Sequence, residues 1–199
     1  MTGYQPWDKS WHNQIIYLPW IQPELPGMED SPVLPAYPVF TDSLKHCADG
    51  FDFFTAVAGA MVFLLGHEPE APVNAQYCAW LNTFNEELAS QLFYQGTDMT
   101  AHYNLPQAIW MLQASLLLEP ESYETNYNLA LAFNQLGTRL MREEKLREAG
   151  DCYQQAKQYF QNAAQLDDTD DYRRVMDAEY RKGEPLLDEG YDSGLHGEW

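Results

Sequence analysis

The stretch from Gln107 to Gly137 constrains the fold of this 199-residue chain more than any other part of the sequence. A helix-forming run ends at Leu118, Pro120 prevents it from continuing, and a second run begins directly afterwards. Small and large apolar residues recur at helical spacing in both runs, so each helix has one apolar face. The sequence therefore predicts two helices, over 105–118 and 121–143, that pack as an antiparallel hairpin.

Apolar spacing and helix-terminating residues predict further helices on both sides of this hairpin. Thr41 or Asp42 is the expected N-cap of a first short helix. Gly66 and Pro69 are expected to end a second helix. That helix has a face of small residues, which predicts close contact with another helix. These residues are Ala56, Gly59 and Ala60. The other expected helices cover 51–65, 74–94, 146–166 and Thr169 or Asp170 to Lys182, with a polar break at 95–104.

Residues 1–40 differ in composition from the expected helical domain at 41–182. Seven prolines exclude a regular helix or a central strand and predict an extended arm. The arm also carries Trp7, Trp11 and Trp20, so it is too apolar for a solvated linker. Two interpretations stay open: the arm packs on its own helical domain, or it lies on another subunit with these aromatic side chains as anchors. Residues 183–199 are acidic and rich in glycine, which predicts a solvated tail.

The net charge of −19 is distributed unevenly, and this limits the class of partner. Before Arg139, Lys9 and Lys45 are the only lysines or arginines. Binding of nucleic acid requires clustered Lys and Arg, so it is excluded for the first two-thirds of the chain, and binding to an anionic membrane surface is disfavoured for the same reason. The expected partner is a protein with a neutral or basic surface.

The cysteines and the longest apolar run bear on compartment. Cys47, Cys78 and Cys152 are odd in number and widely spaced, which predicts reduced, buried thiols in an intracellular, soluble protein. The cysteines do not distinguish the cytoplasm from the interior of an organelle.

No secretory signal is expected, because the N-terminus lacks a basic start followed by an apolar run. The 14-residue run 53–66 is shorter than the roughly 20 residues of a membrane span, so it predicts a buried helix, and only peripheral association with a membrane complex stays open.

The hairpin residues resemble the tetratricopeptide repeat, a 34-residue helix–turn–helix unit. The second helix of one repeat is matched by Ala108 at its small position and Leu112 at its large position, and Pro120 falls at the closing proline. The signature positions of the next first helix and its turn glycine are occupied by Asn126, Leu129, Ala130, Phe133 and Gly137, and Asn126 stands where the family usually has an aromatic residue. The resemblance covers about 105–166. It departs from the repeat pattern where TRLMREE replaces the tight turn after Gly137, and where Ser115 replaces an alanine.

This resemblance implies an all-α fold of the α-solenoid type that binds proteins in a concave groove. The first helix of each repeat lines that groove in the family. The protein-binding residues implied here are Glu124, Tyr127, Leu131, Asn134 and Gln135, joined by Trp7, Trp11 and Trp20 of the arm. The alternative is that another helix of the same chain fills the groove. Members that bind chaperone tails carry Lys and Arg in the groove, and only Asn128 matches that pattern, so a co-chaperone role is not expected.

Two further resemblances concern architecture only. The segment AGDCYQQAKQYFQNAAQLDD resembles the last long helix of plant-type mitochondrial outer-membrane import receptors. The segment NLALAFNQLGTR resembles the banana-shaped helical domain of endosomal-sorting adaptors.

No pattern of catalytic or metal-binding residues is present in the sequence. The histidines lack the H-x-x-x-H and E-x-x-H spacings, and neither a P-loop nor a nucleophile elbow occurs. We therefore expect no enzyme activity, no cofactor and no metal. The sequence favours a non-catalytic adaptor or accessory subunit of a hetero-oligomer. The alternative is a targeting receptor or assembly chaperone that binds client proteins transiently.

Overall fold

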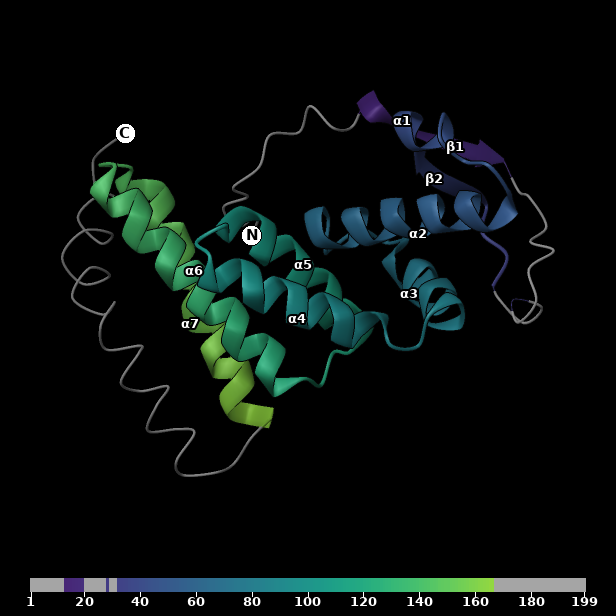
Figure 1. Ribbon diagram of the computed structural model, residues 1–199. Helices are drawn as coiled ribbons and strands as arrows, with labels where there is room; N and C mark the ends of the chain where they lie inside the picture. The colour runs from purple at the N-terminus through teal and green to yellow at the C-terminus, as the bar shows by residue number, and fades with distance from the viewer. Residues whose placement is uncertain (1–12, 20–27, 29–31, 167–199) are drawn as a thin grey trace, which may run out of the picture. The chain divides into compact units, whose positions relative to one another are not determined.

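The computed structural model describes residues 13–19, 28 and 32–166. These residues form a mostly helical fold, as predicted, with a small sheet that the sequence did not predict (Figure 1). The elements in order are β1 (Ile15–Pro19), β2 (Ala36–Phe40), α1 (Thr41–Leu44), α2 (Gly50–His67), α3 (Asn74–Phe84), α4 (Leu88–Ala101), α5 (Leu105–Leu118), α6 (Tyr123–Arg142) and α7 (Leu146–Leu166).

The described residues fall into two compact units, and the division lies within α4 and α5. The unit that we call the sheet unit contains the described residues up to 96 together with 110–120. The second, the hairpin unit, contains 97–109 and 121–166. The helix expected to end at Lys182, the tail at 183–199 and the three arm tryptophans lie outside the described residues.

The described part of the arm forms a two-stranded sheet, which adds to the expectation of an extended arm without a central strand. β1 pairs with β2 in antiparallel register, with Tyr17 opposite Pro38. A proline is tolerated there because a two-stranded sheet has only edge strands. Tyr37 and Val39 of β2 are almost completely buried, and β2 packs on α2. The described part of the arm therefore packs on its own helices, which is the first of the two interpretations.

The core of the sheet unit is built around α2 and a cluster of aromatic rings. Trp80 of α3 is fully buried, and its ring stacks on Phe84 with centroids 5.3 Å apart. The edge of the Tyr37 ring also meets Trp80, which attaches β2 to α3. The helix α2 is long and apolar enough to cross a membrane by length and composition, and 56% of its 18 residues are buried in the fold. Such burial is typical of a core helix and agrees with the predicted buried helix.

Helix capping differs from the expectation at the start of α1. Its N-cap is Phe40, without a side-chain hydrogen bond, so neither Thr41 nor Asp42 is the cap. The carboxylates at the start of α2 do cap a helix: Asp49 Oδ1 accepts from the Asp52 N–H at 2.9 Å, and Asp52 Oδ2 accepts from the Ala48 N–H at 3.0 Å. These bonds satisfy backbone donors that the first turn leaves without helical partners.

Gly66 lies inside α2, whereas the sequence placed it at the helix end. The helix continues to His67. A Cβ atom on Gly66 would overlap the backbone carbonyl of Trp110 in α5 and lie 2.9 Å from the Trp110 Cβ. The absence of a side chain therefore lets the backbones of α2 and α5 approach closely.

The helix expected over 74–94 is interrupted, and the polar break expected at 95–104 is mostly helical. Asn85 follows α3 in an extended conformation, and its Oδ1 accepts from the Glu87 N–H at 3.1 Å. This local bond competes with the helical hydrogen bonds and ends α3. The chain then starts α4, which runs to Ala101.

Buried polar bonds join α5 to earlier helices of the sheet unit. Ser115 Oγ donates to the Ala89 carbonyl in α4 at 2.9 Å, and Cys78 Sγ of α3 donates to the Leu117 carbonyl at 3.4 Å. The hydroxyl of Ser115, at a position where the repeat family has alanine, thus has a partner within the fold.

In the hairpin unit, α6 and α7 lie side by side (Figure 1). Ala130 packs with Phe160 and Ala163, and the rings of Phe133 and Tyr159 stack with centroids 5.7 Å apart. Gly137, which matches the turn glycine of the repeat family, lies inside α6, in agreement with the helix predicted over 121–143. A Cβ there would come within 2.9 Å of the Tyr153 ring. The small and large residues therefore interlock between α6 and α7.

The turn between α6 and α7 consists of Glu143, Glu144 and Lys145. Glu144 has a φ of 61°, the left-handed region that usually holds glycine. Its N–H bonds to the Met141 carbonyl, and the Lys145 N–H bonds to the Leu140 carbonyl. These two bonds form a Schellman motif. The residues TRLMREE therefore extend α6 and then end it in a short turn, so both helices lengthen together.

Replacing Gly66 by alanine should destabilise the chain, because the added methyl group overlaps the Trp110 backbone. Overpacking of this kind costs about 1–3 kcal/mol of unfolding free energy. The matched control is Gly59→Ala in the same helix, where a Cβ meets nothing within 4 Å. That control should stabilise α2 by about 0.5–1 kcal/mol. Urea unfolding followed by circular dichroism measures both, and equal effects of the two substitutions would contradict the close approach.

Replacing Glu144 by glycine should stabilise the hairpin unit by about 0.5–1 kcal/mol, because glycine adopts a positive φ without steric cost. Glu144→Ala is the control and should change stability little, since alanine is strained at the same φ. The midpoint of thermal unfolding reports both changes. A glycine variant less stable than the alanine variant would show that the left-handed turn is not formed.

Candidate functional site

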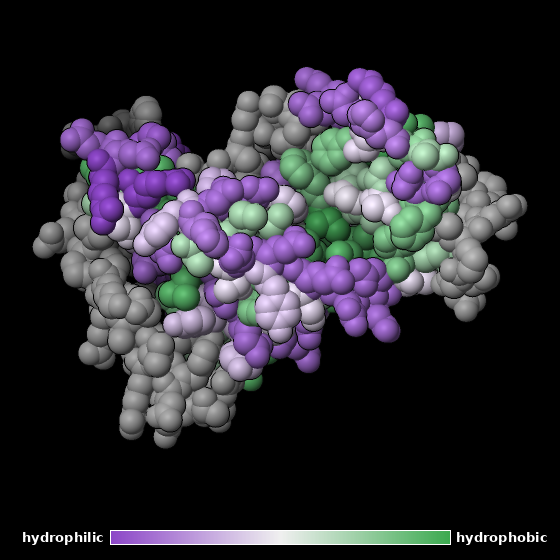
Figure 2. Space-filling model, in the orientation of Figure 1, coloured by the Kyte–Doolittle hydropathy of each residue, from purple (hydrophilic) through white to green (hydrophobic). Residues whose placement is uncertain are grey.

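An open hollow of about 620 Å³ lies on the sheet unit. Its residues come from the end of β2, from α1 and the loop after it, from α2, and from α5. Figure 2 shows an apolar, hollowed surface over α2 with hydrophilic residues along its edge. The lining residues are Phe40, Ser43, His46, Cys47, Asp52, Thr55, Ala56, Gly59, Phe63 and Trp110.

Aromatic rings form the apolar walls of the hollow and contact one another. The edge of one ring meets the face of the other between Phe40 and Phe63, with centroids 5.2 Å apart. The ring of Trp110 lies 5.7 Å from that of Phe63. On α2, His67 stacks on Phe63 at 3.7 Å, and its Nδ1 lies 2.8 Å from the Phe63 carbonyl oxygen. Because each ring is held by a neighbour, the hollow is pre-formed without an occupant.

Polar groups of the hollow are held by local hydrogen bonds. Thr55 Oγ1 donates to the Phe51 carbonyl at 2.9 Å, and Cys47 Sγ donates to the Ser43 carbonyl at 3.3 Å. Asp52 Oδ2 accepts from a backbone N–H, and its side chain is exposed. His46 is exposed as well. The hollow therefore combines apolar walls with a carboxylate and an imidazole that face water.

The hydrogen bonds of these residues do not form a catalytic arrangement. In the described segments, Cys47 makes no hydrogen bond to His46 or Asp52, so no base is positioned to activate the thiol. Likewise, no group of three or more His, Cys, Asp or Glu side chains that could hold a metal ion occurs among the described residues. Burial of apolar surface is the chemistry that the hollow supports best.

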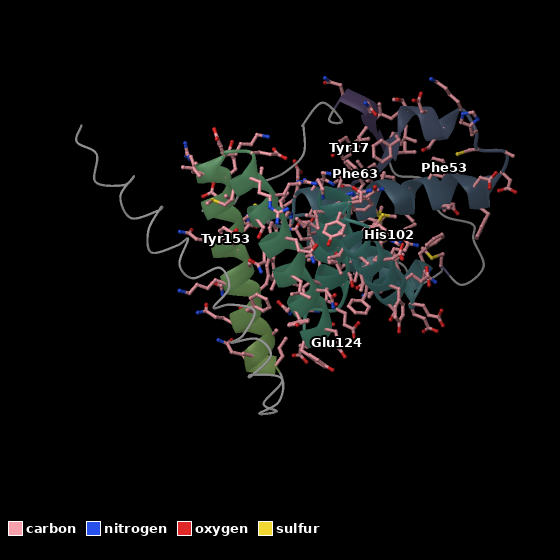
Figure 3. The ribbon with its side chains drawn as sticks, turned by 60° about the vertical axis from the view of Figure 1, so that its left-hand side comes forward. Tyr17, Phe53, Phe63, His102, Glu124 and Tyr153 are labelled. Carbon is pink, nitrogen blue, oxygen red and sulfur yellow. The ribbon has the colours of Figure 1, made fainter. Side chains whose placement is uncertain are left out.

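The residues implied by the repeat resemblance lie on α6, where they are only partly accessible. Glu124 is exposed near the start of the helix, and its carbonyl accepts from Asn128 Nδ2 at 2.9 Å (Figure 3). Tyr127 and Leu131 are half-buried against the cluster formed with α7. The Tyr127 ring meets Phe160 with centroids 5.7 Å apart.

The remaining two residues of this set are half-buried amides. The Asn134 carbonyl accepts from Thr138 Oγ1 at 3.0 Å. The Oε1 atom of Gln135 is covered and has no hydrogen-bond partner among the described residues. Tyr127 and Leu131 therefore share part of their surface with α7, the other helix of the hairpin. Their role in binding a partner stays a prediction.

Sequence reasoning did not identify the hollow, although it singled out part of it. The small-residue face of α2 was expected to contact another helix. Ala60 is indeed fully buried, but Gly59 is exposed and Ala56 is half-buried, and both line the hollow. The partners that complete the hollow, Phe40 and Trp110, are 70 residues apart in the sequence. No local pattern brings such distant residues together.

A comparison with protein-family models, curated proteins and solved structures found no match to this chain. The resemblance to tetratricopeptide repeats therefore rests on the residues quoted for it.

Thiol labelling tests the accessibility of the hollow. All three cysteines are free. Burial raises the pKa of the Cys78 thiol to about 11 and that of Cys152 to about 12, so both stay protonated and poorly reactive at pH 8. Cys47 is half-buried at the hollow and should be labelled by iodoacetamide well before the other two. Mass spectrometry of the folded chain follows the order of labelling. Cys47→Ser should remove the fast phase, and fast labelling of Cys152 would contradict its burial.

Proposed function

We propose that this chain is a non-catalytic protein-interaction subunit, acting as an adaptor or accessory subunit of a larger assembly. The observation that carries the proposal is the pre-formed apolar hollow of the sheet unit, whose walls stay open to solvent. Exposed contiguous apolar surface is unfavourable for an isolated soluble chain and is typical of interaction sites.

The magnitude of apolar burial is adequate for a docking role. One Phe or Trp side chain of a partner buries roughly 150–250 Å². Full burial of one such side chain contributes roughly 1.5–3 kcal/mol, before the cost of association is subtracted. A single aromatic anchor in the hollow, surrounded by weaker contacts, therefore supports specific binding in the way that interface hot spots do.

The hairpin unit supplies a second surface for the same role. Glu124 and Asn128 lie near the start of α6, on the helix that lines the groove in the repeat family. Their bond to one another fixes the amide of Asn128 at this surface. This part of the proposal is supported by the repeat resemblance, and we regard it as the weaker contact because polar rim residues contribute little binding energy.

A transient client-binding role, as in a targeting receptor or assembly chaperone, is the second candidate. The observation that favours it is that the hollow is already formed in the free chain, because its rings are held by neighbours within the unit. A pre-formed site binds and releases a client without first having to fold. The two candidates differ in the lifetime of the complex, which an adaptor holds for much longer.

Filling the hollow should abolish co-purification of its partners. Gly59→Trp places an indole in the hollow from a position where a side chain meets no neighbour. Gly50→Trp adds the same side chain to the same helix at another open position outside the hollow. Tagged chains are purified from the native source, and stoichiometric partners are counted by native mass spectrometry.

The proposal predicts that wild type and Gly50→Trp retain the same stoichiometric partner, and that Gly59→Trp loses it. Circular dichroism must show that both variants fold. Retention of every partner by Gly59→Trp, or measurable turnover of a substrate by the purified chain, would contradict the proposed function. A partner that dissociates within seconds would favour the transient role.

A further inference from the structure

We infer that the occupant of the hollow is a basic segment of another protein, which inserts one bulky apolar side chain between the aromatic walls and places Lys or Arg beside the acidic edge. This inference rests on the proposed function and adds the chemistry of the partner to it. It is carried by the charge of the sheet unit and by the composition of the hollow.

The first step concerns charge. The described residues of the sheet unit include eight acidic residues and a single lysine or arginine, Lys45. That lysine is already paired, since its Nζ lies 2.7 Å from Asp42 Oδ1. The unit therefore offers a partner a strongly negative surface with no competing free cation in its described part. Complementary charge speeds association and excludes acidic partners.

The second step places negative charge at the hollow itself. Asp52 lines the hollow, and Asp49 caps the same helix end. A helix N-terminus carries a positive partial charge equivalent to about half an elementary charge. Two carboxylates exceed it, so the start of α2 is net negative. The hydrogen bonds from Ala48 and Asp52 backbone N–H groups hold both carboxylates in place.

The third step concerns the apolar side chain. Gly59 and Ala56 leave room on α2, while Phe40 and Trp110 supply rings on either side of Phe63. A Phe, Leu or Trp side chain fits such a site because it buries its surface and leaves no polar group unpaired. Lysine stems alone would bury less apolar surface, so the anchor and the basic residues have separate roles.

Other macromolecules fit these observations less well. Nucleic acid and anionic lipid surfaces carry the same sign of charge as the sheet unit and would be repelled. A small organic cation attracted by the rings and by Asp52 is the remaining alternative. It would need no apolar anchor, and this difference separates it from a protein segment in an experiment.

The test uses the purified full chain and three synthetic dodecapeptides. The basic peptide with an apolar anchor is KKRAKFLKRAKK, the acidic counterpart is EEEAEFLEEAEE, and the basic peptide without an anchor is KKRAKSSKRAKK. Binding is followed by fluorescence anisotropy of the labelled peptides at two salt concentrations. Tetraethylammonium is the small-cation probe, and the rate of Cys47 labelling reports occupancy of the hollow.

We expect the first peptide to bind at least tenfold more tightly than either of the others and to slow labelling of Cys47. Its affinity should fall as salt rises from 50 to 300 mM. Gly59→Trp should weaken binding at least tenfold, whereas Gly50→Trp should leave it unchanged. Asp52→Asn, which keeps a side-chain oxygen for the Ala48 N–H, should weaken binding several-fold, and Glu86→Gln, outside the hollow, should not.

Several results would overturn the inference. They are equal binding of the acidic peptide, equal binding by Gly59→Trp, no detectable binding of the basic anchored peptide, and protection of Cys47 by tetraethylammonium alone. The proposed function fails separately. If native partners depend on Gly59 while the basic peptide does not bind, the hollow is an interaction site for a partner of different chemistry.

Discussion

The contact between the backbone of Trp110 and Gly66 is the constraint on which the candidate site depends. Because Gly66 has no side chain, α5 lies close enough to α2 for the Trp110 ring to rest near Phe63 and His67. The rings of Trp110 and Phe63 form one wall of the hollow. A larger residue at position 66 would separate the two helices and remove that wall, so the shape of the hollow follows from one missing Cβ atom.

The described part of the arm also contributes to the site and is more than a tether. β2 is anchored through Tyr37 and Val39, and its last residue, Phe40, lines the hollow directly before α1 begins. The sheet unit thus joins residues from the start, middle and later part of the chain. Long-range packing of this kind defines a concave surface more rigidly than a single helix does.

Much of the helical fold was predictable from local patterns. The bounds of α5 and α7 agree with the predicted ones, because strong apolar periodicity, Pro120 and a polar turn mark their ends. The errors share a physical cause. Gly66 was expected to end a helix, and Gly137 matches the turn glycine of the repeat family, but each lies within a helix and faces a close neighbour from another helix. A sequence pattern cannot distinguish a glycine that ends a helix from one that permits contact, because the neighbour lies far along the chain.

At Asn85 the helix end was missed for a different reason. A local side-chain hydrogen bond ends α3 there, although the apolar pattern continues past it. The site was less predictable than the fold, since its walls come from residues that only tertiary packing brings together.

The apolar character of α2 has a consequence for biosynthesis. During translation, the 18 residues of α2 leave the ribosome before α3 and Trp110 do, because they come earlier in the chain. Until those later residues emerge, β2 and α1 are the elements outside the ribosome that pack on this helix in the finished fold. The nascent chain therefore passes through a stage in which a segment of mean hydropathy 1.4 is largely uncovered. Rapid docking of α3 after it emerges shortens this stage, because α3 packs on α2 in the finished fold.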